Sequence, residues 1–187
     1  MEKVDRRVRK TKTALENTLI KLLKEKNLSK ITAIEIANKA DVHRATFYMH
    51  YQNVDDLFSS LENKVINDFQ EIIKASENNN YEGIYDKIID YIDNNRDLAS
   101  VLLGKNANYE FQNKISEILE NIYLDMWVKV EKRNKVSDAM RYLTHFHITG
   151  CISIISMWIN EEYKLPTDKI KELVYKSASL VDNIVIW

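Results

Sequence analysis

Residues 31–57, ITAIEIANKADVHRATFYMHYQNVDDL, predict two short helices joined by a tight turn, and this arrangement decides the fold of the first part of the chain. Thr32 precedes Glu35 by three residues, which is the spacing of a capping box at a helix start. Asp41 stands where the chain must turn, because a short polar side chain tolerates a left-handed backbone. An apolar stripe at helical spacing between them is formed by Ile34, Ile36, Ala37 and Ala40.

The second helix is expected from about His43 to Tyr51, with two different faces. Its apolar side, which should pack against the first helix, carries Val42, Phe47 and Tyr51. Its outward side carries Arg44, Ala45, Tyr48 and Met49, with Thr46 and His50 on the flank. A cation, hydroxyls and a small residue suit both phosphates and base edges, so the pattern indicates a helix-turn-helix that inserts its second helix into the major groove. An ordinary solvated helix is the alternative.

Residues 42–58, VHRATFYMHYQNVDDLF, resemble the N-terminal DNA-binding domain of the TetR family of transcriptional regulators. The family's hallmark run corresponds here to residues 46–51, followed by Asp55, Asp56 and Leu57, and the likeness covers about the first third of the chain. The resemblance implies that Arg44, Ala45 and Thr46 approach base edges or nearby phosphates, while Tyr48 and His50 bond phosphates. The full set of expected DNA contacts is Thr32, Ala33, His43, Arg44, Ala45, Thr46, Tyr48, Met49 and His50.

Three residues depart from the family's pattern. Asp41 stands where the family usually has Gly, and His43 where it often has a capping Ser or Thr. Val54 replaces a Lys that usually binds phosphate, so one backbone contact is expected to be lost or moved. None of the three breaks the helix pattern.

Composition favours a small all-helical protein. The 187 residues include Gly 3 and Pro 1, which argues against β-sandwiches and Gly-rich phosphate loops. One cysteine, Cys151, excludes an internal disulfide and fits a reducing cytoplasm. The charged N-terminus lacks the apolar region of a secretory signal, and residues 142–159 carry too many polar side chains for a membrane span.

Charge is divided unevenly along the chain. Residues 1–54 contain 12 Lys or Arg against 6 Asp or Glu, whereas the remainder contains 15 against 22. A basic head on an acidic body is typical of a protein that binds a polyanion at one end. The sequence VDRRVRKTK, residues 4–12, is expected to be a basic arm that runs along a groove, or else a frayed terminus.

We expect a three-helix DNA-binding domain over residues 1–53 and a helical effector-binding and dimerisation domain over residues 54–187, with about nine helices in all. The first helix should end near Asn27 as its C-terminal cap, and a long fourth helix should reach about Ala75. The Asn-rich segment 76–83 should break the helical pattern at Gly83. The later helices are expected at about 84–92, 98–103, 109–132, 137–163 and 168–187.

The last two helices are too apolar for a monomer's surface, so two copies are expected to form a four-helix interface. Gly150 would allow a helix of the second copy to approach closely. The alternative is that the same apolar face packs entirely within one chain. Residues 150–166, GCISIISMWINEEYKLP, are similar to a branch common among regulators of low-GC Gram-positive bacteria, and the resemblance implies dimerisation through these helices.

A small, mostly apolar effector is expected to bind between helices of the body. The candidate lining residues are Tyr85, Phe111, Tyr123, Trp127, Phe146 and His147, although such side chains are more often core. Some regulators with such a domain respond to a protein partner instead. His147 and Cys151 share a helix face, but two ligands do not close a zinc site, so no metal is expected.

No motif for catalysis is found, so neither an enzyme nor a cofactor is expected. The sequence predicts a cytoplasmic, homodimeric repressor that a small molecule releases from a pseudo-palindromic operator. The alternatives are an activator working with a protein partner and a helical adaptor without DNA binding. Val54 gives the adaptor its support.

Overall fold

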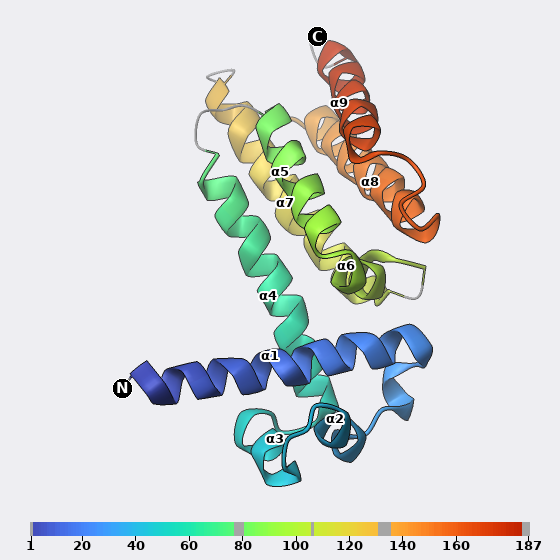
Figure 1. The fold of residues 1–187 in the computed structure, drawn as a ribbon. Helices are drawn as coiled ribbons and strands as arrows, with labels where there is room; N and C mark the ends of the chain where they lie inside the picture. Colours follow the sequence, from blue (N-terminus) through green and yellow to red (C-terminus); the bar gives the residue numbers. More distant parts are fainter. Residues whose placement is uncertain (1, 77–80, 106, 131–135, 185–187) are drawn as a thin grey trace. The chain divides into compact units, whose positions relative to one another are not determined.

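The computed structural model describes residues 2–76, 81–105, 107–130 and 136–184, and every regular element in these ranges is helical (Figure 1). The chain divides into two compact units, Met1–Asn67 and Asp68–Trp187. The first unit contains α1 (Glu2–Glu25), the short 3-10 helix η1 (Leu28–Lys30), α2 (Ala33–Lys39) and α3 (Arg44–His50). Helix α4 (Val54–Lys74) contributes residues to both units. The second unit continues with α5 (Tyr81–Asn94), α6 (Arg96–Leu103), α7 (Tyr109–Val130), α8 (Asp138–Asn160) and α9 (Thr167–Ile184). The all-α fold is therefore confirmed.

The basic N-terminal segment is part of a helix, so the alternative of a frayed terminus was wrong, and contact of this arm with a DNA groove stays a prediction. Helix α1 begins at Glu2, and the side chains of residues 6–10 are all exposed on its first turns. Its later turns bury Leu15, Leu19 and Leu22. Asn27 is not a C-terminal cap of this helix, because it has an extended backbone and precedes η1. The helix continues through the basic residues because nothing in residues 4–12 is a helix breaker.

The predicted helix-turn-helix is present in α2 and α3. The Thr32 hydroxyl accepts a hydrogen bond from the Glu35 backbone N–H at 3.2 Å, which confirms the predicted cap. Ile36 and Ala37 are buried as expected, but Ile34 is 46% exposed, so its place in the apolar stripe was wrong. Ala33 is the residue that is buried in its stead, at 9% exposure. In a helix of seven residues the sequence pattern is too short to fix which side faces inward.

Asp41 adopts a left-handed backbone with φ 54°, as the turn requires. A side chain in this region costs free energy that Gly avoids, although Asp tolerates it better than most residues. We therefore expect Asp41→Gly to raise the free energy of unfolding by roughly 0.5 kcal/mol and Asp41→Val to lower it by about 1 kcal/mol or more. Urea denaturation of the three proteins measures both changes. If Asp41→Gly were less stable than the parent, the left-handed backbone at this position would not carry the expected steric cost.

In the second unit, α8 packs against α7 on one side and α9 on the other, and α9 also contacts α5 (Figure 1). Ser137 caps α8 by accepting a hydrogen bond from the Met140 backbone N–H at 3.2 Å. Gly104 caps the C-terminal end of α6 with an extended backbone, and only glycine fits there, because a Cβ would lie 2.4 Å from the Ser100 carbonyl oxygen. Gly83 lies inside α5 and does not break the helical pattern, which corrects the expected boundary. No described helix is long and apolar enough to cross a membrane.

Candidate nucleic-acid interface

Helix α3 presents most of the predicted contact residues on its outer face. Met49 is 79% exposed and Tyr48 is 48% exposed, and Arg44 and Ala45 are exposed with them. Thr46 and His50 lie half-buried on the flank, as predicted. The opposite face is closed, since Phe47 is fully buried and Tyr51, at the C-terminal end, is 5% exposed. Helix α3 therefore has one supporting face and one face available for a partner.

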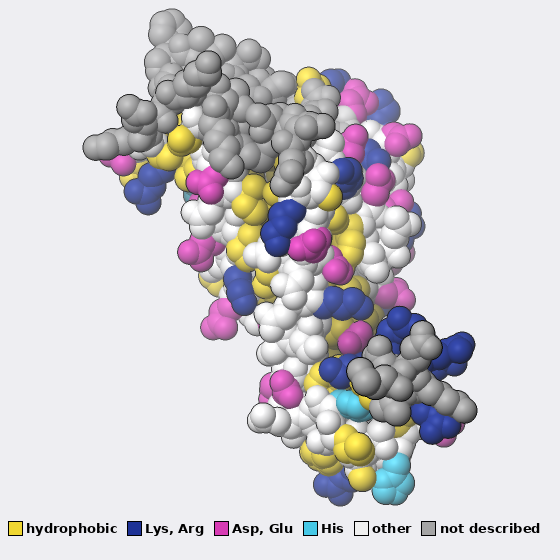
Figure 2. Space-filling view, turned by 90° about the vertical axis from the view of Figure 1, so that its left-hand side faces the viewer, with side chains coloured by type: hydrophobic (Ala, Val, Ile, Leu, Met, Phe, Trp, Pro, Cys, Tyr) yellow, Lys and Arg dark blue, Asp and Glu magenta, His cyan; other side chains and the backbone are white. Residues whose placement is uncertain are grey.

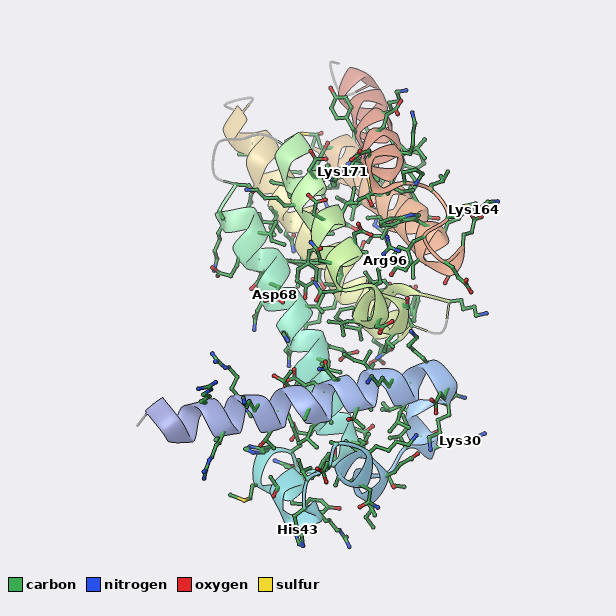
Figure 3. The ribbon with its side chains drawn as sticks, in the orientation of Figure 1. Lys30, His43, Asp68, Arg96, Lys164 and Lys171 are labelled. Atoms are coloured by element: carbon green, nitrogen blue, oxygen red, sulfur yellow. The ribbon has the colours of Figure 1, made fainter. Side chains whose placement is uncertain are left out.

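His43 caps α3, although it stands where the family often has Ser or Thr (Figure 3). Its Nδ1 atom accepts a hydrogen bond from the Ala45 backbone N–H at 3.3 Å. The imidazole thus supplies the acceptor that a hydroxyl would supply, and the helix start is preserved. Arg44 lies one turn before Tyr48, and its guanidinium carbon is 5.5 Å from the centre of the Tyr48 ring. This stacking holds the guanidinium beside the outer face of α3.

A network between α1, α3 and α4 fixes the position of α3. The Tyr51 hydroxyl donates to Glu16 Oε1 at 3.4 Å, and Lys64 Nζ lies 3.5 Å from Glu16 Oε2. Burial, and then the neighbouring Glu16 carboxylate, raise the pKa of Tyr51 to about 12, so the hydroxyl keeps its proton. This network could not be predicted from the sequence, because partners 35 residues apart leave no periodic signal. Glu16 and Lys64 belong to the support of the site.

The junction between α3 and α4 is rigidly hydrogen-bonded. Asn53 Oδ1 accepts from the Asp56 backbone N–H, and Asp56 Oδ2 accepts from the Gln52 backbone N–H, each at 2.8 Å. Val54, the first residue of α4, is half-buried beside this pair of caps. The helix start is therefore intact without the Lys that the family usually has at this position.

Exposed positive charge is concentrated in the unit that contains α3. On the face drawn in Figure 2, Lys and Arg side chains gather in the first unit. Four exposed cations lie on the first turns of α1: Arg6, Arg7, Arg9 and Lys10. Among the other expected contacts, Thr32 is exposed at the start of α2, whereas the buried Ala33 can offer only its backbone N–H. The first unit thus combines a protruding polar helix with a surplus of cations, which suits a polyanion with readable edges.

The second unit contains a small apolar cavity, of about 30 Å³. It is lined by Ile73, Ile84, Tyr85, Ile88, Leu119, Ile122, Tyr123 and Ile148. Of the predicted lining residues, Tyr85 and Tyr123 are in place, and Phe111 is buried but does not line this cavity. Phe146 is 69% exposed, so its prediction as a lining residue was wrong. The Trp127 side chain lies outside the described part of the structure.

Behind the cavity wall, His147 is buried in a polar cluster. Its Nε2 atom and the Tyr85 hydroxyl oxygen are hydrogen-bonded at 2.5 Å, and Cys151 Sγ lies 3.7 Å from the ring nitrogens. Burial lowers the pKa of His147 from 6.5 to about 4, so the ring is neutral at pH 7. Burial likewise raises the pKa of Cys151 to about 11. No group of three or more metal-ligating side chains is found among the described residues.

The low pKa of His147 predicts a loss of stability in acid. The unfolded chain binds a proton near pH 6.5 but the folded chain only near pH 4, so the free energy of unfolding falls as the pH is lowered through this window. The expected loss from this group is up to about 3 kcal/mol at pH 4. Chemical denaturation at several pH values from 7 to 4 gives the free energy of unfolding at each pH. As the pH is lowered, this free energy should fall less steeply for His147→Gln than for the parent. Equal slopes would contradict the burial of a neutral ring.

The chain is similar in sequence to known transcriptional regulators. The sequence model of the transcriptional regulator C-terminal region, TetR_C_8, matches residues 79–179, more than half of the chain. A segment of 61 residues is 38% identical to the uncharacterized HTH-type transcriptional regulator YxbF from Bacillus subtilis (strain 168), and it covers 32% of this chain and 16% of that protein.

Solved structures share the fold. A TetR transcriptional regulator from Streptococcus agalactiae 2603V superposes with a TM-score of 0.67 at 24% identity, covering 95% of this chain and 96% of that one. The dihydroxyacetone kinase operon activator DhaS gives a TM-score of 0.64 at 18% identity, covering 94% and 96%. At these identities the likeness shows the fold alone, whereas the C-terminal match shows the family. With a helix-turn-helix in its first unit, the chain belongs to the TetR family of DNA-binding transcriptional regulators.

Proposed function

We propose that the protein is a homodimeric repressor whose two α3 helices bind a pseudo-palindromic operator. The observation that carries this proposal is the outer face of α3, where Arg44, Tyr48 and Met49 are exposed on a helix whose other face is fully packed. Two such helices related by a twofold axis would read half-sites about 34 Å apart, one turn of the duplex. Repression follows because a bound dimer would occlude promoter DNA.

Each contact residue has a role that its chemistry supports. Arg44, Ala45 and Thr46 occupy the first turn of α3 and would approach base edges or nearby phosphates, since the N-terminal part of a recognition helix enters the groove first. Tyr48 and His50 would bond phosphates from the next turn. Thr32, and Ala33 through its backbone N–H, would meet the duplex backbone at the start of α2.

Dimerisation would bury an apolar face that one chain leaves uncovered. Tyr142, Phe146 and Met157 fall on one side of α8 and are 78%, 69% and 62% exposed. Gly150 lies on this side, and a Cβ built on it would meet no atom within 4 Å. Leu173 of α9 is 45% exposed. Exposed aromatic side chains on one helical face are typical of an interface, so α8 and α9 of two copies would form a four-helix contact.

A small effector in the second unit would release the operator. The cavity includes Ile73 of α4, and α4 is one continuous helix that also contributes Leu57 and Leu61 to the core of the first unit. A ligand that binds better when Ile73 is displaced would shift the population of α4 and so weaken DNA binding. The protein would act in the cytoplasm, where operator DNA is accessible.

Two alternatives have a specific observation behind them. An activator that works with a protein partner is one, and DhaS is by its name an operon activator. A helical adaptor without DNA binding is the other, and the Val54 residue in place of a phosphate-binding Lys favours it. A reporter fused to the regulated promoter separates repressor from activator, because deletion of the regulator raises expression in the first case and lowers it in the second.

The proposal is tested by a gel shift with DNA from upstream of the protein's own gene, repeated over a salt series. Because phosphate contacts release counterions, the logarithm of the affinity should fall linearly with the logarithm of the salt concentration. A shift that unrelated DNA of equal length does not compete supports an operator-binding regulator. No shift, or affinity that does not depend on salt, supports the adaptor.

Restoring the missing Lys gives a further prediction. The Val54→Lys variant places a cation at the first residue of α4 without removing the Asn53 and Asp56 caps. We expect operator affinity to rise several-fold, to about tenfold, and the salt slope to steepen by about one counterion. Val54→Gln is the matched control, because it adds length and polarity without charge. If both variants bind like the parent, the start of α4 does not lie against the duplex backbone.

A further inference from the structure

We infer that Met49 contacts the methyl group of a thymine in the major groove, so that α3 selects an A·T base pair in each half-site of the operator. This inference rests on the proposed function, in which α3 binds operator DNA. It adds which base pair is read through apolar contact and which side chain reads it.

Met49 lies on the outer face of α3 and is covered by little of the protein itself. At 79% exposure it is the most exposed large apolar side chain among the described residues. Folding of the first unit does not need it, because Phe47 and Tyr51 already fill the inner face of α3. Ala45 lies one turn earlier on the same outer face and is also exposed. The two side chains therefore present apolar surface that a partner can cover.

The chemistry of these two side chains limits what they can recognise on DNA. Ala has no polar side-chain atom, and the Met thioether is only a weak hydrogen-bond acceptor, so neither can read the donors and acceptors of a base edge. The apolar group that a base presents in the major groove is the C5-methyl of thymine. Covering this methyl with the Met49 side chain removes apolar surface of both partners from water. An A·T base pair is therefore favoured over a G·C base pair at this position.

The neighbours of Met49 favour a nucleic acid over an apolar protein surface as its partner. Arg44 and Tyr48 are exposed on the same helix, and the Arg44 guanidinium carbon lies 5.5 Å from the centre of the Tyr48 ring. The Tyr48 ring also packs edge-on against buried Phe47, with ring centres 5.4 Å apart, so its direction is set by the core. A cation and a hydroxyl beside Met49 would suit phosphates and base edges but would be costly to bury in an apolar interface.

Met49 and Ala45 differ in reach, and this decides which of them is tested. The unbranched thioether chain of Met adapts its shape to the group that it covers. Ala45 is short, so its main contribution would be to let the backbone of α3 come close to the bases. We therefore assign the methyl contact to Met49, whose exposure also means that its replacement leaves the core of the first unit intact.

The test begins with the full-length protein and selection of bound duplexes from a random library. Thymines that recur in both half-sites are then replaced, one position at a time, by deoxyuridine, which lacks the methyl group and keeps the same base pairing. At one such position, replacement in both half-sites should lower the affinity of the parent by about tenfold, because one buried methyl is lost in each half-site. Fluorescence anisotropy at low salt, where phosphate contacts keep weakened variants bound, measures each affinity.

Two variants show whether Met49 makes the contact. In Met49→Ala the same deoxyuridine replacement should change the affinity by less than about twofold, because the side chain that covers the methyl is gone. Ile34→Ala is the matched control, since Ile34 is also an exposed apolar residue of the first unit, at 46%, but lies on α2. The control should keep the tenfold loss of the parent.

Each outcome decides the inference. A methyl-dependent loss that Met49→Ala abolishes and Ile34→Ala keeps supports it. Selected duplexes without a recurrent thymine, equal binding of thymine and deoxyuridine duplexes, or equal behaviour of the two variants overturns it and leaves operator binding by α3 intact. If no duplex is selected at all, the inference and the proposed function are both overturned.

Discussion

Replacing Phe146 by Glu is expected to convert the protein to a monomer and to weaken operator binding at least about 100-fold. The Phe146 ring is 69% exposed on the apolar face of α8, between Tyr142 and Gly150 along the chain. In a twofold interface the change acts twice, and it places two carboxylates in a surface that excludes water. Loss of an interface hot spot of this kind costs about 2–4 kcal/mol, and a monomer also loses the linked second half-site.

Sedimentation analysis and a gel shift of the same samples measure the two effects. Tyr109→Glu is the control, because Tyr109 is also an exposed aromatic residue, at 73%, but lies at the start of α7. The control should remain dimeric and bind the operator like the parent. If Phe146→Glu stays dimeric, the interface lies elsewhere and the assignment to the outer face of α8 is wrong.

The second large loss of operator affinity is expected from Arg44→Ala. Arg44 begins α3, and its guanidinium stacks on Tyr48. In the proposed complex this guanidinium would make two hydrogen bonds to one base edge. Removing it should reduce operator affinity by about 10- to 100-fold, equivalent to about 1–3 kcal/mol, and should relax the base preference at one position of each half-site.

Tyr48→Phe separates base reading from backbone binding. It removes the hydroxyl alone, so it should weaken all duplexes by a similar, smaller factor of about fivefold. Lys105 is exposed in the second unit, so Lys105→Ala serves as the control and should leave DNA binding unchanged. Fluorescence anisotropy with the operator and with singly substituted operators measures the three variants. If Arg44→Ala and Tyr48→Phe both bind like the parent, α3 does not read the DNA as assigned.

Local signals in the sequence were enough to place most of the helices. Thr32 and Ser137 each accept a hydrogen bond from a backbone N–H three residues later, and Asp41 adopts the left-handed backbone that its short polar side chain tolerates. These three roles depend on neighbouring residues, so they could be predicted from the sequence. The inward and outward faces of α3 were also predicted correctly, because Phe47 and Tyr51 lie one helical turn apart and mark its buried side.

The orientation of α8 could not be predicted in the same way. This helix is apolar or small on most of its circumference, so the sequence pattern gave no reason to place Phe146 outside and His147 inside. The choice depends on packing against α7 and α9, which is a tertiary effect. The aliphatic part of the cavity wall could not be predicted for a related reason, since Ile and Leu side chains at helical spacing look the same whether they fill a core or line a cavity.

Hydroxyl-radical footprinting of the bound operator tests the central claim most directly, because it maps where the protein lies on the duplex. Two α3 helices on a twofold axis should protect two blocks on one face of the DNA, with centres about 34 Å apart, one helical turn. Both blocks should weaken together in Phe146→Glu. A single protected block, or protection that does not follow the helical repeat, would contradict a dimer that reads its operator through α3.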